Sequence, residues 1–121
     1  MANTFKVVTF AAEPASAGTP YVMYTVAGSS TTVVLGLILT NIHSTAVTAE
    51  VELVSDTANR GGTNNVTNGT AFLIKDVSIP AGSSLELLSG GKVVMETTDV
   101  LRIDCSVTDK ISGTLSIMEI T

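Results

Sequence analysis

The side chains that could support chemistry are few and lie far apart in the sequence. His43 is the only histidine and Cys105 the only cysteine. A nucleophilic site needs a base beside the nucleophile and a third group that orients the base. Cys105 falls on the apolar side of an alternating segment, which is typical of a small buried hydrophobe, and His43 falls in a turn between predicted strands. We therefore predict no catalytic residue and no enzymatic activity.

The acidic residues do not form a metal-binding pattern. Glu50 and Glu52 would share one face of a strand, where they could contact one cation. Two carboxylates without further ligands are more typical of a solvated strand face. Other acidic residues fall at predicted turns, where carboxylates stabilise reversals by bonding to backbone: Glu13, Asp76, Asp99 and Asp109. We predict no metal site and no cofactor.

The charge balance excludes two classes of partner. The formal net charge is −5, and the six Lys and Arg residues are spread singly along the chain. Nucleic acids and anionic membrane surfaces both require a clustered basic face. The longest apolar run is far shorter than the ~20 residues that a membrane-spanning helix needs, and the N-terminus lacks the pattern of a signal peptide. We expect neither a nucleic-acid nor a membrane partner, and synthesis in a cytoplasm.

The composition points to a surface that another protein covers. The 121 residues predict one domain over residues 1–121. Hydrophobic residues make up 45% of the chain and charged residues only 14%, against a typical charged content of ~25%. A small domain with so few charges exposes apolar surface. We therefore expect a homo-oligomer or a protein partner.

Short alternating or apolar segments separated by turn residues predict β-strands throughout. Residues 83–96 contain two short apolar runs joined by Ser89, Gly90 and Gly91, which favours a tight reversal. No segment has convincing helical periodicity. The other predicted strands are residues 5–10, 21–26, 31–41, 47–53, 71–79, 100–107 and 113–120. This spacing predicts a single antiparallel β-sandwich, of jelly-roll or immunoglobulin-like type, with about eight or nine strands.

Two of these segments are apolar on both faces. In residues 31–41, alternation places Leu35, Leu37 and Leu39 on one face and Val34 and Ile38 on the other. Either the strand lies centrally with both faces covered, or a second subunit covers its outer face. Gly36 within this segment indicates a bulge or a close approach of backbone. Residues 113–120 are also partly apolar on both faces, with Met118 on the outer one.

Two polar or small-residue segments are candidates for contacts. Residues 1–20 would comprise a strand followed by a flexible arm, with residues 11–19 as the arm. Residues 55–70 form the longest polar stretch, and loops of this length tend to be functional or mobile. They are either a solvated hairpin tip, which Asn68 and Gly69 could close, or a loop that contacts a neighbouring subunit.

Several motifs, in order, resemble a family of small bacteriophage virion proteins, common in phages of cyanobacteria and other marine bacteria. The resemblance covers about three-quarters of the chain, through residues 33–41, 47–53, 72–88, 91–94, 99–103 and 119–121. Residues 55–70 are longer than the corresponding connection in that pattern. The resemblance implies a non-enzymatic structural component of a virus particle, in a capsid decoration, a tail or a fibre.

Taken together, these observations favour a virion protein that decorates or cements a phage capsid by oligomerising and adhering to capsid subunits. A tail, baseplate or fibre component is the alternative. A carbohydrate-binding module for host recognition is a third, in which Tyr21 and Tyr24 would supply the exposed aromatic rings. The expected contact residues are Val34, Ile38, Asn59, Arg60, Asn64, Asn65 and Met118, with residues 11–19 and 59–70.

Overall fold

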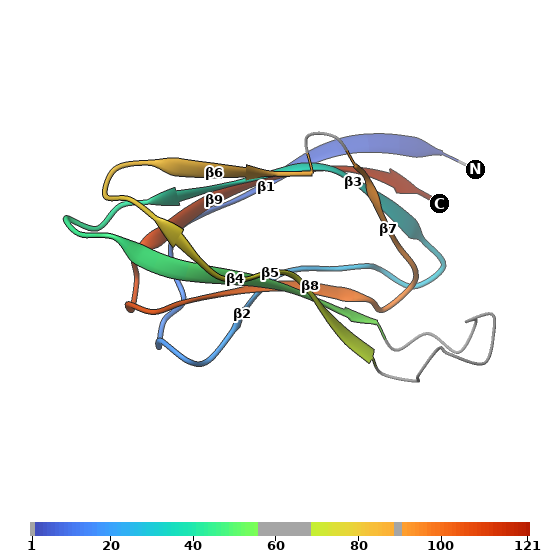
Figure 1. Ribbon diagram of the computed structural model, residues 1–121. Helices are drawn as coiled ribbons and strands as arrows, with labels where there is room; N and C mark the ends of the chain where they lie inside the picture. Colours follow the sequence, from blue (N-terminus) through green and yellow to red (C-terminus); the bar gives the residue numbers. More distant parts are fainter. Residues whose placement is uncertain (1, 56–68, 89–90) are drawn as a thin grey trace.

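The computed structural model describes residues 2–55, 69–88 and 91–121, and these form an all-β protein of two stacked layers (Figure 1). Within these ranges there are nine strands and no helix. The strands are β1 (Asn3–Glu13), β2 (Tyr21–Thr25), β3 (Thr31–Asn41), β4 (Val47–Ser55), β5 (Gly69–Ile79), β6 (Ser84–Leu87), β7 (Val93–Met95), β8 (Val100–Cys105) and β9 (Ile111–Ile120). This confirms the predicted all-β class and the predicted number of strands.

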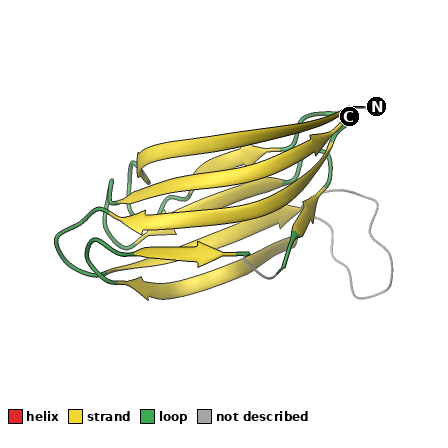
Figure 2. Ribbon diagram, turned by 90° about the horizontal axis from the view of Figure 1, so that it is seen from above, coloured by secondary structure: helices red, strands yellow, loops and turns green. Residues whose placement is uncertain are grey.

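The strands form two antiparallel sheets packed face to face. The five-stranded sheet has the order β1-β9-β3-β6, with β7 also paired to β3, and the four-stranded sheet has the order β2-β8-β4-β5. Every pairing between these strands is antiparallel. Figure 2 shows the two layers from above, with their strands running in similar directions. The predicted antiparallel β-sandwich is therefore confirmed.

The strand order is that of a jelly roll. When β6 and β7 are counted as one interrupted strand, the first strand pairs with the last, the second with the next to last, and so on to β4 and β5. A long antiparallel hairpin that is rolled up into two sheets produces this nested pairing. Both chain ends lie at the same end of the sandwich (Figure 1), and Ala2 and Thr121 exchange backbone hydrogen bonds.

The core lies between the sheets and is mainly aliphatic. As the alternation predicts, Val47, Ala49 and Val51 of β4 are buried, and so is the apolar face of β8 with Cys105. From the five-stranded sheet, the core contains Phe10, Val34, Leu37, Leu39, Leu87, Met95, Ile111, Leu115 and Ile117.

A bulge in β3 overturns one predicted face. The register of β3 against β9 shifts between Val34 and Gly36, so Leu35 is the extra residue. A bulge of one residue reverses which residues face inward beyond it. Val34 and Leu37 are therefore both fully buried, and the prediction that Val34 lies on the outer face is wrong. The expected irregularity at Gly36 is confirmed.

The predicted hairpin between the two apolar runs of residues 83–96 is also wrong. β6 pairs with residues 37–40 of β3 and β7 with residues 32–34, both in antiparallel fashion. The two short strands therefore run in the same direction along one side of β3. Ser89 and Gly90 of the predicted reversal lie outside the described residues.

The predicted arm is a loop folded against the four-stranded sheet. β1 continues to Glu13, beyond the predicted end at residue 10. The amide of Ala17 donates to Thr108 Oγ1 at 3.0 Å, and that of Gly18 donates to Asp104 Oδ1 at 3.1 Å. Residues 56–68 lie outside the described residues, and with them the expected contact residues Asn59, Arg60, Asn64 and Asn65.

Candidate interaction surface

The residues considered for chemistry do not form a catalytic group. Cys105 is buried in the core. His43 is half-buried at the start of a turn, where its backbone amide donates to Asn41 Oδ1 at 2.8 Å. Among residues 2–55, 69–88 and 91–121, no group of three or more His, Cys, Asp or Glu could hold a metal ion.

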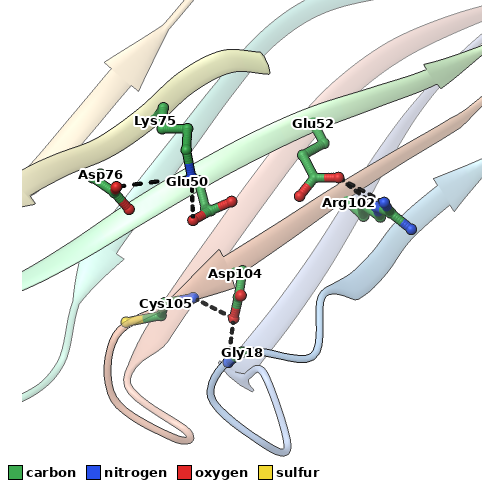
Figure 3. A network of polar contacts seen from close by, with 8 residues as sticks. All are labelled: Gly18, Glu50, Glu52, Lys75, Asp76, Arg102, Asp104 and Cys105. Carbon is green, nitrogen blue, oxygen red and sulfur yellow. Dashed lines mark hydrogen bonds and ion pairs between the residues drawn. The ribbon is translucent and has the colours of Figure 1, made fainter. Parts of the chain in front are cut away.

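The outer face of the four-stranded sheet is charged, and two of its carboxylates, those of Glu50 and Glu52, are paired with basic side chains (Figure 3). Arg102 donates from Nε and Nη2 to Glu52 Oε2, at 2.8 and 2.7 Å. Lys75 Nζ lies 3.4 Å from Glu50 Oε1 and 4.7 Å from the ring centroid of Phe72. The predicted outward direction of Glu50 and Glu52 is thus confirmed, and each carboxylate has a basic partner. The expectation that both are solvated is wrong for Glu52, which is buried.

A depression of about 330 Å³ on this face brings together three carboxylates, those of Glu50, Asp76 and Asp104. Glu50 and Asp76 both lie within ion-pair distance of Lys75. Asp104 Oδ1 accepts from the amides of Gly18 and Cys105, at 3.1 and 2.8 Å. These bonds fix the loop before β2 against β8, so Asp104 has a structural role.

The outer face of the five-stranded sheet is different, because a row of apolar side chains crosses it. Phe5 on β1 is in register with Met118 on β9, Met118 with Val33 on β3, and Val33 with Val94 on β7. Phe5 is 71% exposed and Val94 60%, while Met118 and Val33 are half-buried between them. Adjacent in-register side chains contact one another across a sheet. The row is therefore a continuous apolar strip with exposed ends.

More apolar surface flanks this strip. Val7 and Ile38 are also exposed, and between β9 and β6 lies a depression of about 320 Å³ at Gly36, bordered by Leu35, Ile38, Glu86, Thr114 and Ser116. Of the outward residues on these five strands, Glu86 is the one charged side chain, and the rest are apolar or small and polar. We call this surface the apolar face.

The apolar face contains two of the residues expected from the sequence. Ile38 is exposed there and Met118 lies within the strip, whereas Val34 points into the core. Phe5, Val7, Val33 and Val94 were missed as surface residues. The alternation in residues 5–9 could have indicated Phe5 and Val7, but the strip itself depends on pairing between distant strands.

The two tyrosines are not on an exposed face. The Tyr21 ring lies 5.3 Å from that of Phe10 in the core. The Tyr24 hydroxyl donates to Glu119 of the opposite sheet and lies 2.8 Å from Thr32 Oγ1, and Glu119 also pairs with Lys6 at 2.7 Å. Tyr21 and Tyr24 therefore do not supply the exposed aromatic pair that the carbohydrate-binding alternative requires.

The cluster around Glu119 shifts two pKa values. Hydrogen bonds from Lys6 and Tyr24 lower the pKa of Glu119 below its ordinary value. Burial, together with the bond to Glu119, raises the pKa of Tyr24 to about 12. Because Tyr24 belongs to the four-stranded sheet and Glu119 to the five-stranded one, the cluster links the two layers at one end of the sandwich.

The described part of the chain holds no helix that could span a membrane. No protein-family model, no curated protein and no solved structure matches this chain.

Proposed function

We propose that this protein is a structural component of a bacteriophage particle that decorates the capsid and adheres to it through the apolar face. The observation that carries the proposal is the strip of Phe5, Met118, Val33 and Val94 on a face with one charged side chain. Apolar side chains exposed on such a face are unfavourable in water, and contact with a partner would bury them.

The energetics of such a contact suit a protein that acts in many copies. Burying ~200 Å² of apolar side chain at ~25 cal/mol per Å² gives about 5 kcal/mol before the cost of association is subtracted. A contact of this size is weak for a single copy. On a symmetric particle, neighbouring copies that also contact one another bind much more tightly than one copy alone.

The sequence resemblance to small phage virion proteins supports a place in a virus particle, in a capsid decoration, a tail or a fibre. The jelly-roll strand order agrees with it, since capsid proteins often use this fold, although lectins use it too. A tail or fibre component would use the same adhesive chemistry at another location. The carbohydrate-binding alternative loses support, because Tyr21 and Tyr24 lie between the sheets.

The test compares two matched double variants for binding to phage capsids that lack this protein. One variant, Ile38→Ser with Val94→Ser, removes exposed apolar groups from the apolar face. The control, Val22→Ser with Phe72→Ser, removes groups of similar exposure from the strands of the other sheet. We expect the first variant to lose co-sedimentation with capsids and the control to retain it.

Two results would overturn the proposal. One is a wild-type protein that does not sediment with capsids, and the other is equal binding by both double variants. The copy number in intact particles tests the location separately. A number comparable to that of the capsid subunits supports decoration, and a far lower number places the protein in the tail.

A further inference from the structure

β1 differs from the other edge strands because it has no protection against pairing with another strand. It pairs with β9 from Asn3 to Phe10 without a register shift. No described strand pairs with its other side. Natural sheets usually protect such an edge with bulges, charges, proline or a short strand.

Each of the other edges has one of these protections. β2 has five residues and a register shift at Met23. β5 has two register shifts, and Lys75 and Asp76 lie within it. β6 and β7 have only four and three residues.

The backbone of β1 presents a regular set of free hydrogen-bonding groups. Ala2 and Thr121 exchange both backbone hydrogen bonds, at 3.1 and 2.9 Å. In an antiparallel pair, residues that bond to the partner alternate with residues that point away. With the uninterrupted register, the even residues from Thr4 to Phe10 therefore bond to β9. The N–H and C=O groups of the odd residues point to the open side: Asn3, Phe5, Val7 and Thr9.

The side chains of β1 leave this edge accessible. Those of Phe5 and Val7 lie on the apolar face and are 71% and 64% exposed. Lys6 is the one charged residue between Asn3 and Ala12. Its side chain lies on the opposite side of the sheet and pairs with Glu119 of the same molecule, so its charge is compensated.

We propose that β1 pairs in antiparallel fashion with β1 of a second copy, which joins the two five-stranded sheets into one continuous sheet about a two-fold axis. A two-fold axis places the same strand on both sides of the contact. Phe5 and Val7 of the two copies then lie beside each other on one face, as aromatic and β-branched cross-strand neighbours that stabilise a sheet. Each facing pair of odd residues exchanges two hydrogen bonds.

Charge favours a second copy at this edge over one at the outer face of the four-stranded sheet. The chain carries a net charge of −5, so most approaches between two copies are repulsive. The four-stranded sheet would bring Glu50, Asp76 and Asp104 toward their counterparts, whereas β1 brings a compensated lysine and neutral residues. The dimer would also place two apolar faces side by side. The proposed adhesion to a capsid does not by itself require this arrangement.

The test uses Val7→Pro, which removes one free N–H while leaving an apolar side chain. Proline is tolerated on an edge strand where its missing N–H would face solvent. Sedimentation should show a wild-type dimer and a dissociation constant raised at least ~10-fold in Val7→Pro. Val7→Lys, which places a charge at the edge, should also raise the dissociation constant. It replaces the proline variant in this test if that variant fails to fold. Ile38→Ser with Val94→Ser should remain dimeric.

Hydrogen exchange gives a second readout that only edge pairing produces. In the wild-type dimer, the amides of Phe5, Val7 and Thr9 should exchange slowly, and in Val7→Lys those of Phe5 and Thr9 should become fast. The amides of Lys6 and Val8, which bond to β9, should stay protected in both. A monomeric wild type, or a dimer that survives both Val7 variants, overturns the inference. Since Ile38→Ser with Val94→Ser tests capsid adhesion without touching β1, either proposal can fail alone.

Discussion

The ring of Phe10 occupies the space where residue 113 would have a side chain. The two residues are direct partners in the register of β1 and β9. A Cβ at position 113 would lie 2.2 Å from Phe10 Cζ and 2.4 Å from Cε1. Phe10 is buried and also contacts the Tyr21 ring. Glycine at 113 is therefore required by the ring across the sheet, since the position lies within a strand and not in a turn.

Replacing this glycine should destabilise the protein. Gly113→Ala forces the Phe10 ring out of its place in a closely packed core, and overpacking of this kind typically costs ~1–3 kcal/mol. Gly36→Ala is the matched control, because no heavy atom lies within 4 Å of its added Cβ and the change should stay within ~0.5 kcal/mol. Urea denaturation measures both. Equal loss of stability in the two variants would contradict the packing argument.

The ion pair of Glu119 should make stability decline in acid. Lys6 and Tyr24 lower the pKa of Glu119 from its ordinary value of 4.5, so the folded state stabilises the ionised carboxylate relative to the unfolded state. This stabilisation is complete above pH ~4.5 and is lost as the pH falls through the lowered pKa. The difference in free energy of unfolding between wild type and Glu119→Gln should therefore shrink between about pH 6 and pH 3. Urea denaturation of both proteins across this pH range measures that difference. A constant difference would contradict this assignment.

Ionisation of Tyr24 should make stability decline in alkali. Burial and the bond to Glu119 raise its pKa from 10.0 to about 12, so folding favours the protonated phenol. The stabilisation is complete below pH ~10 and is lost as the pH rises toward 12. Tyr24→Phe should lack this part of the alkaline decline. Ultraviolet absorbance of tyrosinate, compared between wild type and variant, should assign the late ionisation to Tyr24.

Local pattern was sufficient to predict the class of fold, but it could not predict which strands meet. The alternation of Val47, Ala49 and Val51 gave the inner face of β4 correctly, because period two is a local property of a strand. The bulge at Leu35 reversed the face of Val34, and no local signal besides Gly36 marked it. The apolar strip requires β1, β9, β3 and β7 to align in one register, and this alignment depends on the whole nested topology.

The Arg102–Glu52 ion pair on the four-stranded sheet should contribute more to stability than the exposed Lys75–Glu50 pair. The Glu52 side chain is 9% exposed and accepts two bonds from Arg102. Arg102→Met leaves that carboxylate poorly solvated and without its partner, which we expect to cost ~2–4 kcal/mol. Lys75→Met is the control, since Lys75 is 55% exposed, and exposed pairs contribute at most ~1 kcal/mol. Thermal or urea unfolding would reveal the contrast, and similar losses in both variants would argue against it.

The side chain of one buried asparagine, Asn41, links the two sheets. Asn41, at the end of β3, is fully buried. Its Nδ2 donates to the carbonyl oxygens of Ile79 and Thr45, at 2.9 and 3.0 Å, and its Oδ1 accepts from the His43 amide. Ile79 ends β5 in the opposite sheet, so one side chain from the five-stranded sheet satisfies backbone groups of the four-stranded sheet and of the turn between β3 and β4.

Asn41→Asp tests whether the donors of this amide are the important part. The substitution keeps the size and the acceptor for His43, but it replaces both N–H donors with a carboxylate that faces two carbonyl oxygens. Leaving buried carbonyls unpaired costs ~1–3 kcal/mol, and a buried charge adds to that loss. Thr45→Ala keeps the backbone carbonyl that Asn41 bonds and should change stability by less than ~0.5 kcal/mol. If Asn41→Asp unfolds at the same urea concentration as the wild type, the amide donors do not hold the sheets together.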